Sequence, residues 1–390
     1  MRIGLISGEY PPDQGGVGDF TRELARSLAD IGHETHVITN ASGKLQVASC
    51  KSQVASRKSL SVHRVMSGWG WGCWGQALTL AQDLSLDVLN VQYQAAAYDM
   101  HPAINFVPHK KNRPPVVVTF HDLKVPYLFP KAGPLRRWVV RLLARRADGV
   151  IVTNEEDAKK VASCKFQLSN LALIPIGSNI PVAPPPGYNR DVERAKWGVG
   201  TDDLLLGYFG FLNESKGGEE LMQTLALLVE QGSPAHLLMI GGRVGSSDPS
   251  NRAYAERVEN LIASLGLSER VHWSGYARPD KVSAGLLAAD VCVLPYRDGV
   301  SFRRGTLHAC LTHGRAIVTT HPAVELPQVR DGENMLLAEP RDTEELAQTV
   351  ARLAADPALR TRLEAGAKAL AAEFTWERIA RQTAAFFRRL

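Results

Sequence analysis

The stretch SFRRGTLHACLTHG, residues 301–314, combines two adjacent arginines with a glycine and two threonine hydroxyls. Arg303 and Arg304 follow an apolar run and precede a pattern typical of a helix. Guanidinium groups bind phosphate oxygens through paired hydrogen bonds, and the N–H groups at a helix start add further donors. Because the stretch contains no acidic residue, it indicates a site for an anion. The alternative is that one arginine only neutralises a nearby acid such as Asp298.

A second cationic position lies in GYFGFLNESKGGEE, residues 207–220. Lys216 follows an apolar run, and Gly217 and Gly218 then open a helical pattern. An ammonium group and helix N–H groups directed at one spot suit a diphosphate. The alternative is a lysine on the solvated surface.

Glycines also follow the first apolar run, in GEYPPDQGGVGDF, residues 8–20. Gly15, Gly16 and Gly18 allow a ligand to approach the backbone closely, which suits a phosphate or a cluster of sugar hydroxyls. The spacing differs from GxGxxG, so a nicotinamide cofactor is disfavoured. The alternative is a plain tight turn.

His121 and Asp122 end the apolar run VVVTF. A histidine at the end of a strand can hydrogen-bond a substrate hydroxyl or titrate near neutral pH. The alternative is a pair that caps the loop backbone.

These positions all follow runs that read as buried strands, which predicts parallel sheets covered on both faces. Ligands of such sheets bind beyond the carboxyl ends of the strands. The expected strands lie within 2–7, 35–39, 87–93, 116–122 and 149–154 in the first half, and within 204–210, 235–242, 270–276, 290–296, 315–320 and 335–338 in the second.

Three consecutive prolines in SNIPVAPPPGYNRD, residues 178–191, cannot continue a helix or a central strand. We therefore expect the linker between two domains there. The predicted fold is α/β, with two doubly wound Rossmann-like domains, residues 1–182 and 183–374, facing across a cleft.

Composition narrows the class of protein further. The chain has 390 residues, a net charge of +5 and five scattered cysteines without a CxxC pair. This favours a reducing, cytoplasmic setting without disulfides or structural zinc. The charge is too small to indicate nucleic acid, and no run is long enough to span a membrane.

The order of these motifs resembles the retaining glycosyltransferases of family 4, which have the GT-B fold. The resemblance rests on GGVG before a helix, FHD, GFLNESKG, and DVCVLPYRDG with the later HG and IVTT, and it covers nearly the whole chain. AEFTWERIARQTAAFF also looks like the family's last helix, which crosses back to the N-terminal domain and assigns about 375–390 to it.

The resemblance implies a nucleoside-diphosphate sugar as donor, bound by the second domain, and no other cofactor or metal. The acceptor would be a glycan, a lipid-linked molecule or a small molecule. Lys216 matches the family's lysine, but Phe211 stands where the family has an arginine, and Ser301 and Ala309 stand where it has two glutamates. A register shifted by one would place His308 at the second of these.

We predict that an arginine of the 301–314 stretch supplies the charge missing at Phe211. The expected catalytic residues are Lys216, His121 and Arg303. The expected substrate-binding residues are Gly15, Gly16, Gly18, Asp122, Gly217, Ser301, Arg304, Gly305, Thr306 and Glu325.

Two other functions remain open from the sequence. One is a partner subunit with the same fold that binds without turnover, which the missing arginine and glutamates favour. The other, less favoured, is a sugar-nucleotide epimerase, which needs acid/base carboxylates that are scarce here.

Two stretches bear on the acceptor. Trp69, Trp71 and Trp74 could stack on sugars, although packing at the edge of the domain is the favoured interpretation. The basic amphipathic segment 135–146 could contact a membrane surface, or pack on the sheet with a solvated basic face.

Overall fold

The computed structural model describes residues 1–13, 15–41, 59–109, 111, 113–123, 133–163, 170–243 and 249–390. The chain divides into two compact units: Met1–Gly177 with Thr375–Leu390, and Ser178–Phe374. The division falls at the first residue of the expected linker, so residues 178–182 group with the second unit rather than the first. The backbone N–H of Ala183 donates to Ser283 Oγ at 3.1 Å, which ties the proline segment to that unit.

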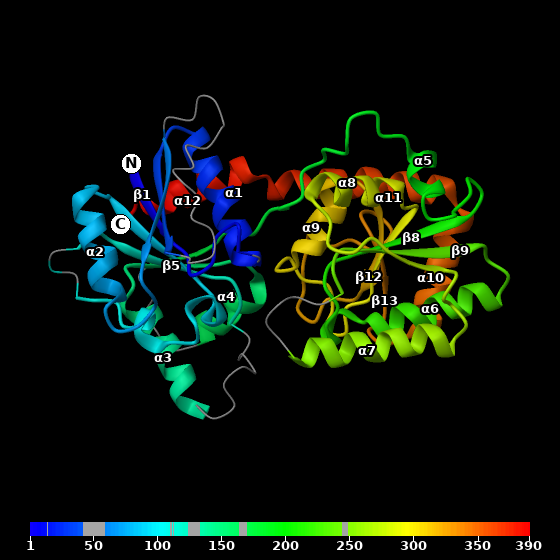
Figure 1. The fold of residues 1–390 in the computed structure, drawn as a ribbon, viewed down its shortest axis with the longest axis horizontal. Helices are drawn as coiled ribbons and strands as arrows, with labels where there is room; N and C mark the ends of the chain where they lie inside the picture. Colours follow the sequence, from blue (N-terminus) through cyan, green and yellow to red (C-terminus); the bar gives the residue numbers. More distant parts are fainter. Residues whose placement is uncertain are drawn as a thin grey trace. The chain divides into compact units, whose positions relative to one another are not determined.

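The first unit is a seven-stranded parallel sheet with the strand order β3-β2-β1-β4-β5-β6-β7. Helix α12 returns from the end of the chain to pack on α1, and the rings of Phe20 and Trp376 meet at 5.1 Å (Figure 1). The strands are β1 (Arg2–Ile6), β2 (Glu34–Asn40), β3 (Leu60–Met66), β4 (Val88–Tyr93), β5 (Val116–Phe120), β6 (Gly149–Val152) and β7 (Leu171–Leu173). The helices are α1 (Gly16–Asp30), α2 (Cys73–Asp83), α3 (Gly133–Arg146), α4 (Glu155–Ser163) and α12 (Trp376–Phe387).

The sequence missed β3 and β7, which are the two edge strands of this sheet. Both carry side chains that are exposed or half-buried along most of their length. An edge strand contacts a neighbour on one side only, so it lacks the continuous apolar run that identified the central strands.

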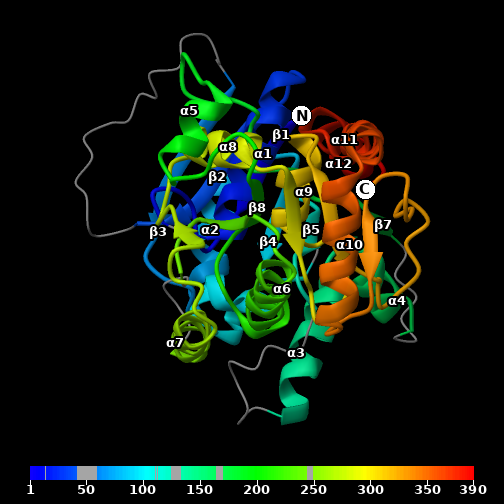
Figure 2. The same cartoon turned by 90° about the vertical axis from the view of Figure 1, so that its right-hand side faces the viewer.

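The second unit is a six-stranded parallel sheet with the order β10-β9-β8-β11-β12-β13, and all six strands were expected. Helices α6 and α7 lie on one side of the sheet and α8 and α9 on the other, and α10 packs beside α6 (Figures 1 and 2). The strands are β8 (Leu204–Phe209), β9 (Ala235–Ile240), β10 (Val271–Trp273), β11 (Val291–Leu294), β12 (Ala316–Thr320) and β13 (Leu336–Ala338). The helices are α5 (Arg190–Ala195), α6 (Gly218–Glu230), α7 (Pro249–Ser264), α8 (Pro279–Ala288), α9 (Gly305–Thr312), α10 (Thr343–Ala355) and α11 (Pro357–Ala371). Two doubly wound parallel sheets confirm the predicted fold class.

In each unit the order of strands reverses beside the first strand, between β1 and β4 and between β8 and β11. The loops after these strands therefore diverge and leave room for a ligand. In the second unit the loops after β8 and β11 touch at Gly217, whose φ is +70°. A Cβ there would lie 1.9 Å from the carbonyl oxygen of Pro295, so only glycine allows this approach.

This contact predicts the cost of Gly217→Ala. Gly232 has a similar φ of +81° but open space around a Cβ, so Gly232→Ala is the matched control. We expect the control to lose about 1–2 kcal/mol of unfolding free energy, because an L-residue is strained in this region. Gly217→Ala should lose roughly 1–3 kcal/mol more, because the backbone of Pro295 must also move. Equal losses in urea denaturation would show that the two loops are not in close contact.

Candidate functional site

The loop after β8 presents Lys216 at the end of a short 3-10 helix, Glu214–Lys216. The Nζ donates to the carbonyl oxygen of Phe211 at 2.9 Å and lies 3.2 Å from the Cβ position of Gly210. Desolvation, and next the charge of Arg304, lower the pKa of Lys216 to about 7. Within the described part of the chain no carboxylate forms an ion pair with this ammonium.

The same loop is held in place by Arg297, which follows β11. Its guanidinium pairs with three carboxylates that begin the neighbouring helices, and its backbone N–H donates to the carbonyl oxygen of Ser215 at 3.0 Å. The carboxylates are Glu214 at 3.2 Å, Glu219 at 2.5 Å and Glu220 at 2.6 Å. These three carboxylates therefore stabilise the loop through ion pairs with Arg297, and they form no ion pair with Lys216.

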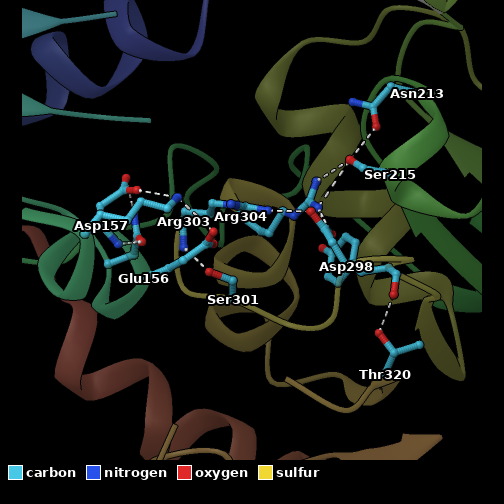
Figure 3. A network of polar contacts seen from close by, with 12 residues as sticks. Glu156, Asp157, Asn213, Ser215, Asp298, Ser301, Arg303, Arg304 and Thr320 are labelled. Carbon is cyan, nitrogen blue, oxygen red and sulfur yellow. Dashed lines mark hydrogen bonds and ion pairs between the residues drawn. The ribbon is translucent and has the colours of Figure 1, made fainter. Parts of the chain in front are cut away.

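Arg303 and Arg304 share one carboxylate, that of Asp298 (Figure 3). Arg303 Nη2 donates to Asp298 Oδ2 at 2.6 Å, and Arg304 Nη2 donates to Asp298 Oδ1. The two arginine side chains are only 9% and 10% exposed. The alternative considered from the sequence, neutralisation of Asp298, is therefore part of the arrangement, and it involves both arginines.

Arg304, rather than Arg303, is the arginine beside Lys216. Both of its terminal nitrogens reach Ser215 Oγ, at 3.2 and 3.3 Å, and its Cζ lies 4.6 Å from the centre of the Tyr296 ring. Its Nε is buried and has no hydrogen-bond partner. A buried N–H without a partner is costly, so an additional acceptor at this point would stabilise the site.

Helix α9 begins directly after these arginines, and no side chain caps its first turn. A Cβ on Gly305 would meet open space, so the start of the helix is accessible. Thr306 Oγ1 bonds the hydroxyl of Tyr296 at 2.6 Å, and its methyl group packs at the Cβ position of Gly210. Ser301 is buried and its Oγ accepts a long hydrogen bond, 3.5 Å, from the N–H of Arg303.

His308 does not take the place of the second family glutamate. Its ring is buried against Phe302 and Phe374, and its Nε2 bonds the carbonyl oxygen of Phe302 at 2.8 Å. Burial lowers the pKa of His308 to about 4. Ala309 is fully buried, and Glu325 is exposed on the loop between β12 and β13. The structure therefore places His308 in the core, with its Nδ1 buried and without a hydrogen-bond partner.

In the first unit, the glycine loop after β1 already holds a carboxylate of the protein itself. Glu9 Oε1 accepts hydrogen bonds from the N–H groups of Val17 at 2.9 Å and Gly18 at 3.1 Å, at the start of α1. A Cβ on Gly15 would lie 2.2 Å from this carboxylate, whereas a Cβ on Gly16 would meet open space. Gly15 thus makes room for Glu9, and only Gly16 faces an open region.

His121, at the carboxyl end of β5, is fixed by neutral neighbours. Its Nε2 and Gln92 Oε1 lie 2.9 Å apart, and the edge of its ring meets Phe20 with the centroids 4.6 Å apart. Burial lowers the pKa of His121 to about 3. Asp122 follows it, half-buried. His121 is therefore a neutral hydrogen-bonding group and too weak a base to remove a proton from an alcohol.

The tryptophan stretch divides into core and surface. Trp69 and Trp74 are buried, as the favoured interpretation expected, while Trp71 is 68% exposed and contacts Phe106. Helix α3 has an exposed Trp138 and exposed Arg141 and Arg145, and the side chains of its first residues, 133–137, lie outside the described part.

Several groups at these sites were not predicted from the sequence. Asn90 and Gln92 carry a usable signal, because they interrupt the otherwise apolar strand VLNVQY at alternate positions. Glu9, Ser215 and Tyr296 are assigned only by their contacts. Among the described residues, no three or more His, Cys, Asp or Glu side chains gather where they could hold a metal ion. No described helix is long and apolar enough to cross a bilayer.

Two family models match the chain: "Glycosyltransferase Family 4" over residues 14–180 and "Glycosyl transferases group 1" over residues 203–356. Among curated relatives are two D-inositol 3-phosphate glycosyltransferases. That of Streptomyces bingchenggensis is 24% identical, covering 98% of this chain and 88% of its own. That of Corynebacterium urealyticum is 25% identical, and the match covers 100% of this chain and 96% of the relative.

Solved structures show the same architecture. Sucrose-phosphate synthase from Thermosynechococcus elongatus has a TM-score of 0.75 at 21% identity, covering 100% of this chain and 98% of its own. Anabaena HepE in complex with UDP also has a TM-score of 0.75, at 19% identity, and both chains are covered completely. The two matching family models together with this shared architecture show that the chain belongs to the glycosyltransferases of family 4 and has the GT-B fold.

Proposed function

We propose that this protein transfers a sugar from a nucleoside-diphosphate sugar to a hydroxyl of a glycan, lipid-linked or small-molecule acceptor, with retention of configuration and without a metal ion. The observation that carries this proposal is the pair Lys216 and Arg304. Two cations lie together at the carboxyl end of one sheet, and one of them has a buried N–H without a partner. A diphosphate provides an acceptor oxygen for that N–H and a negative charge for Lys216, which has no carboxylate partner among the described residues.

The cations act on the bond that breaks. As the bond from the sugar carbon to the diphosphate oxygen cleaves, negative charge grows on the leaving oxygen, and fixed positive groups stabilise that charge. Two unit charges about 4 Å apart interact by ~4 kcal/mol at an effective dielectric near 20, so Arg304 can assume the electrostatic role of the arginine replaced by Phe211. We propose that Thr306 and the first N–H groups of α9 hydrogen-bond further oxygens of the diphosphate.

The solved neighbours support a uridine nucleotide as the first donor to try, since Anabaena HepE is described in complex with UDP and with UDP-glucose. The D-inositol 3-phosphate glycosyltransferases support a hydroxyl acceptor. Within the first unit, we propose that His121, Asp122 and the open backbone at Gly16 contact sugar hydroxyls.

Binding without turnover is the second candidate, because Ser301 and Ala309 are buried and provide no carboxylate where the family has two. Release of free UDP from UDP-glucose, with a panel of alcohols as acceptors, separates the two functions. Turnover supports the transferase, and tight binding without UDP release supports the partner subunit.

The donor site predicts a specific loss of binding. Lys216→Met and Arg304→Met should each weaken UDP binding by roughly tenfold or more, because each removes a charge-assisted hydrogen bond of about 1.5–3 kcal/mol. Arg278→Met removes an arginine that is 83% exposed in the same unit and is the matched control. Isothermal titration measures all three. Unchanged affinity in both site variants, or an equal loss in the control, contradicts the assignment.

The lowered pKa of Lys216 predicts that donor binding takes up a proton. At pH 8 only about one in ten free proteins carries the Lys216 proton if its pKa is near 7, and a bound diphosphate raises that pKa. UDP-glucose binding at pH 8 should therefore take up close to one proton, and affinity should fall as pH rises from 7 to 9. Titrations in buffers of different ionisation enthalpy measure the uptake. Uptake that persists in Lys216→Met would assign it to another group.

We also propose that the surface around α3 contacts anionic lipid. Trp138 is 52% exposed, Phe106 lies between it and Trp71, with ring centroids 6.2 and 5.3 Å apart, and exposed Arg141 and Arg145 add positive charge. Indole rings and arginines together favour the interface of an anionic bilayer.

This surface predicts sedimentation with vesicles that contain phosphatidylglycerol and less binding at high salt, because the arginine term is screened. Trp71→Ser with Trp138→Ser should abolish most of the binding. Tyr276→Ser, which removes a 68% exposed aromatic ring from the second unit, is the control. Equal binding by the double variant and the control would exclude this surface.

A further inference from the structure

Buried polar side chains of β4 and β5 form a series of hydrogen bonds that ends at His121. Asn90 and Gln92 are completely buried in β4. Asn90 Nδ2 donates to Thr119 Oγ1 at 2.9 Å and to the carbonyl oxygen of Val117 at 3.3 Å, and Gln92 Nε2 donates to Asn90 Oδ1. Gln92 Oε1 then lies 2.9 Å from His121 Nε2.

The direction of each hydrogen bond in this series follows from its first member, the carbonyl oxygen of Val117. The Val117 carbonyl can only accept, so the amide nitrogen of Asn90 must face it. Asn90 Oδ1 is then left to accept from Gln92 Nε2, which turns Gln92 Oε1 toward the imidazole. An amide oxygen can only accept, so His121 Nε2 must carry the hydrogen.

This direction decides what His121 can bind. Among the described residues, the imidazole contacts Gln92 from β4 and Phe20 from α1, and neither carries a charge. Because burial keeps its pKa near 3, the ring stays neutral at working pH. With hydrogen on Nε2, the lone pair of Nδ1 can accept a hydrogen bond from a hydroxyl. Unprotonated Nδ1 cannot donate a hydrogen bond to a phosphate oxygen, and an ionised phosphate oxygen cannot donate one to Nδ1.

The glycine loop of the same unit points to the same ligand chemistry. The Glu9 carboxylate takes the N–H groups of Val17 and Gly18, which a phosphate would otherwise use. Burial raises the pKa of Glu9, and the nearby carboxylates of Asp19 and Asp13 raise it further. Of the nearby arginines, Arg22 pairs with Asp19 and Glu23, and Arg64 donates to the carbonyl oxygen of Pro11.

We propose that Gln92 and Asn90 are positioning residues that hold His121 in the Nε2–H form, and so commit this edge of the first unit to a neutral, hydroxyl-bearing part of the sugar substrates rather than to a phosphate. The hydroxyl half of this inference rests on the proposed function. The assignment of the imidazole tautomer is independent of the proposed function, because it follows from the series of hydrogen bonds alone.

Long-range proton–nitrogen spectra of protein labelled with ¹⁵N-histidine test the imidazole directly, with His121→Asn identifying the signals. We expect Nε2 protonated and Nδ1 unprotonated at pH 7, without titration between pH 5 and 9. Gln92→Met removes the acceptor at nearly constant volume and should give a mixture of both tautomers. Gln92→Glu keeps an acceptor oxygen but loses the donor to Asn90 Oδ1, so it should keep hydrogen on Nε2 and raise the pKa of the imidazole. Gln76→Met, which changes a half-buried glutamine that bonds Ser67, is the matched control.

Kinetics test the hydroxyl half. Gln92→Met should lower kcat/KM for sugar transfer by about tenfold, the size of one net hydrogen bond. Neither Gln92→Met nor Gln92→Glu should change UDP affinity by more than about twofold, since the diphosphate cluster lies in the other unit.

Hydrogen on Nδ1 of His121 in the unmodified protein, or Gln92→Met spectra that match it, overturns the positioning role. Predicted spectra with unchanged kcat/KM in Gln92→Met overturn the hydroxyl assignment. Absence of sugar transfer in every variant, including the unmodified protein, speaks against the proposed function instead, and the spectra still decide the tautomer.

Discussion

The candidate site depends on buried positive charge at the carboxyl ends of β8 and β11. Asp298 pairs with Arg303 and Arg304, and Lys216 lies beside Arg304 without an ion pair to a carboxylate among the described residues. Burying a charge without a partner is unfavourable, and the lowered pKa of Lys216 shows the cost. We therefore propose that a bound dianion stabilises this arrangement.

The two units present opposite hydrogen-bonding chemistry at corresponding edges of their sheets. In the second unit, side chains after β8 and β11 are donors with positive charge. In the first, Glu9 and the lone pair of His121 are acceptors, and the carboxylate fills the helix start that could have bound phosphate. A sugar nucleotide has both needs, since its diphosphate only accepts and its sugar hydroxyls donate.

The sequence predicted the central strands and the position of Lys216 because both depend on local pattern: continuous apolar runs, and a cation between a strand and a helix. It could not distinguish Arg303 from Arg304, since neighbouring residues in a turn point in directions that only tertiary contacts decide. Edge strands β3 and β7 were not predicted, because most of their side chains are exposed or half-buried and form no continuous apolar run. Glu9 was overlooked because its partners are backbone N–H groups eight and nine residues further along.

A crystal structure of the protein with UDP tests the central claim most directly. The account predicts diphosphate oxygens within hydrogen-bond distance of Lys216 Nζ and of Arg304 Nε, the buried nitrogen that has no partner in the free protein. A diphosphate bound at the glycine loop of the first unit, with Arg304 Nε still unpaired, would contradict it.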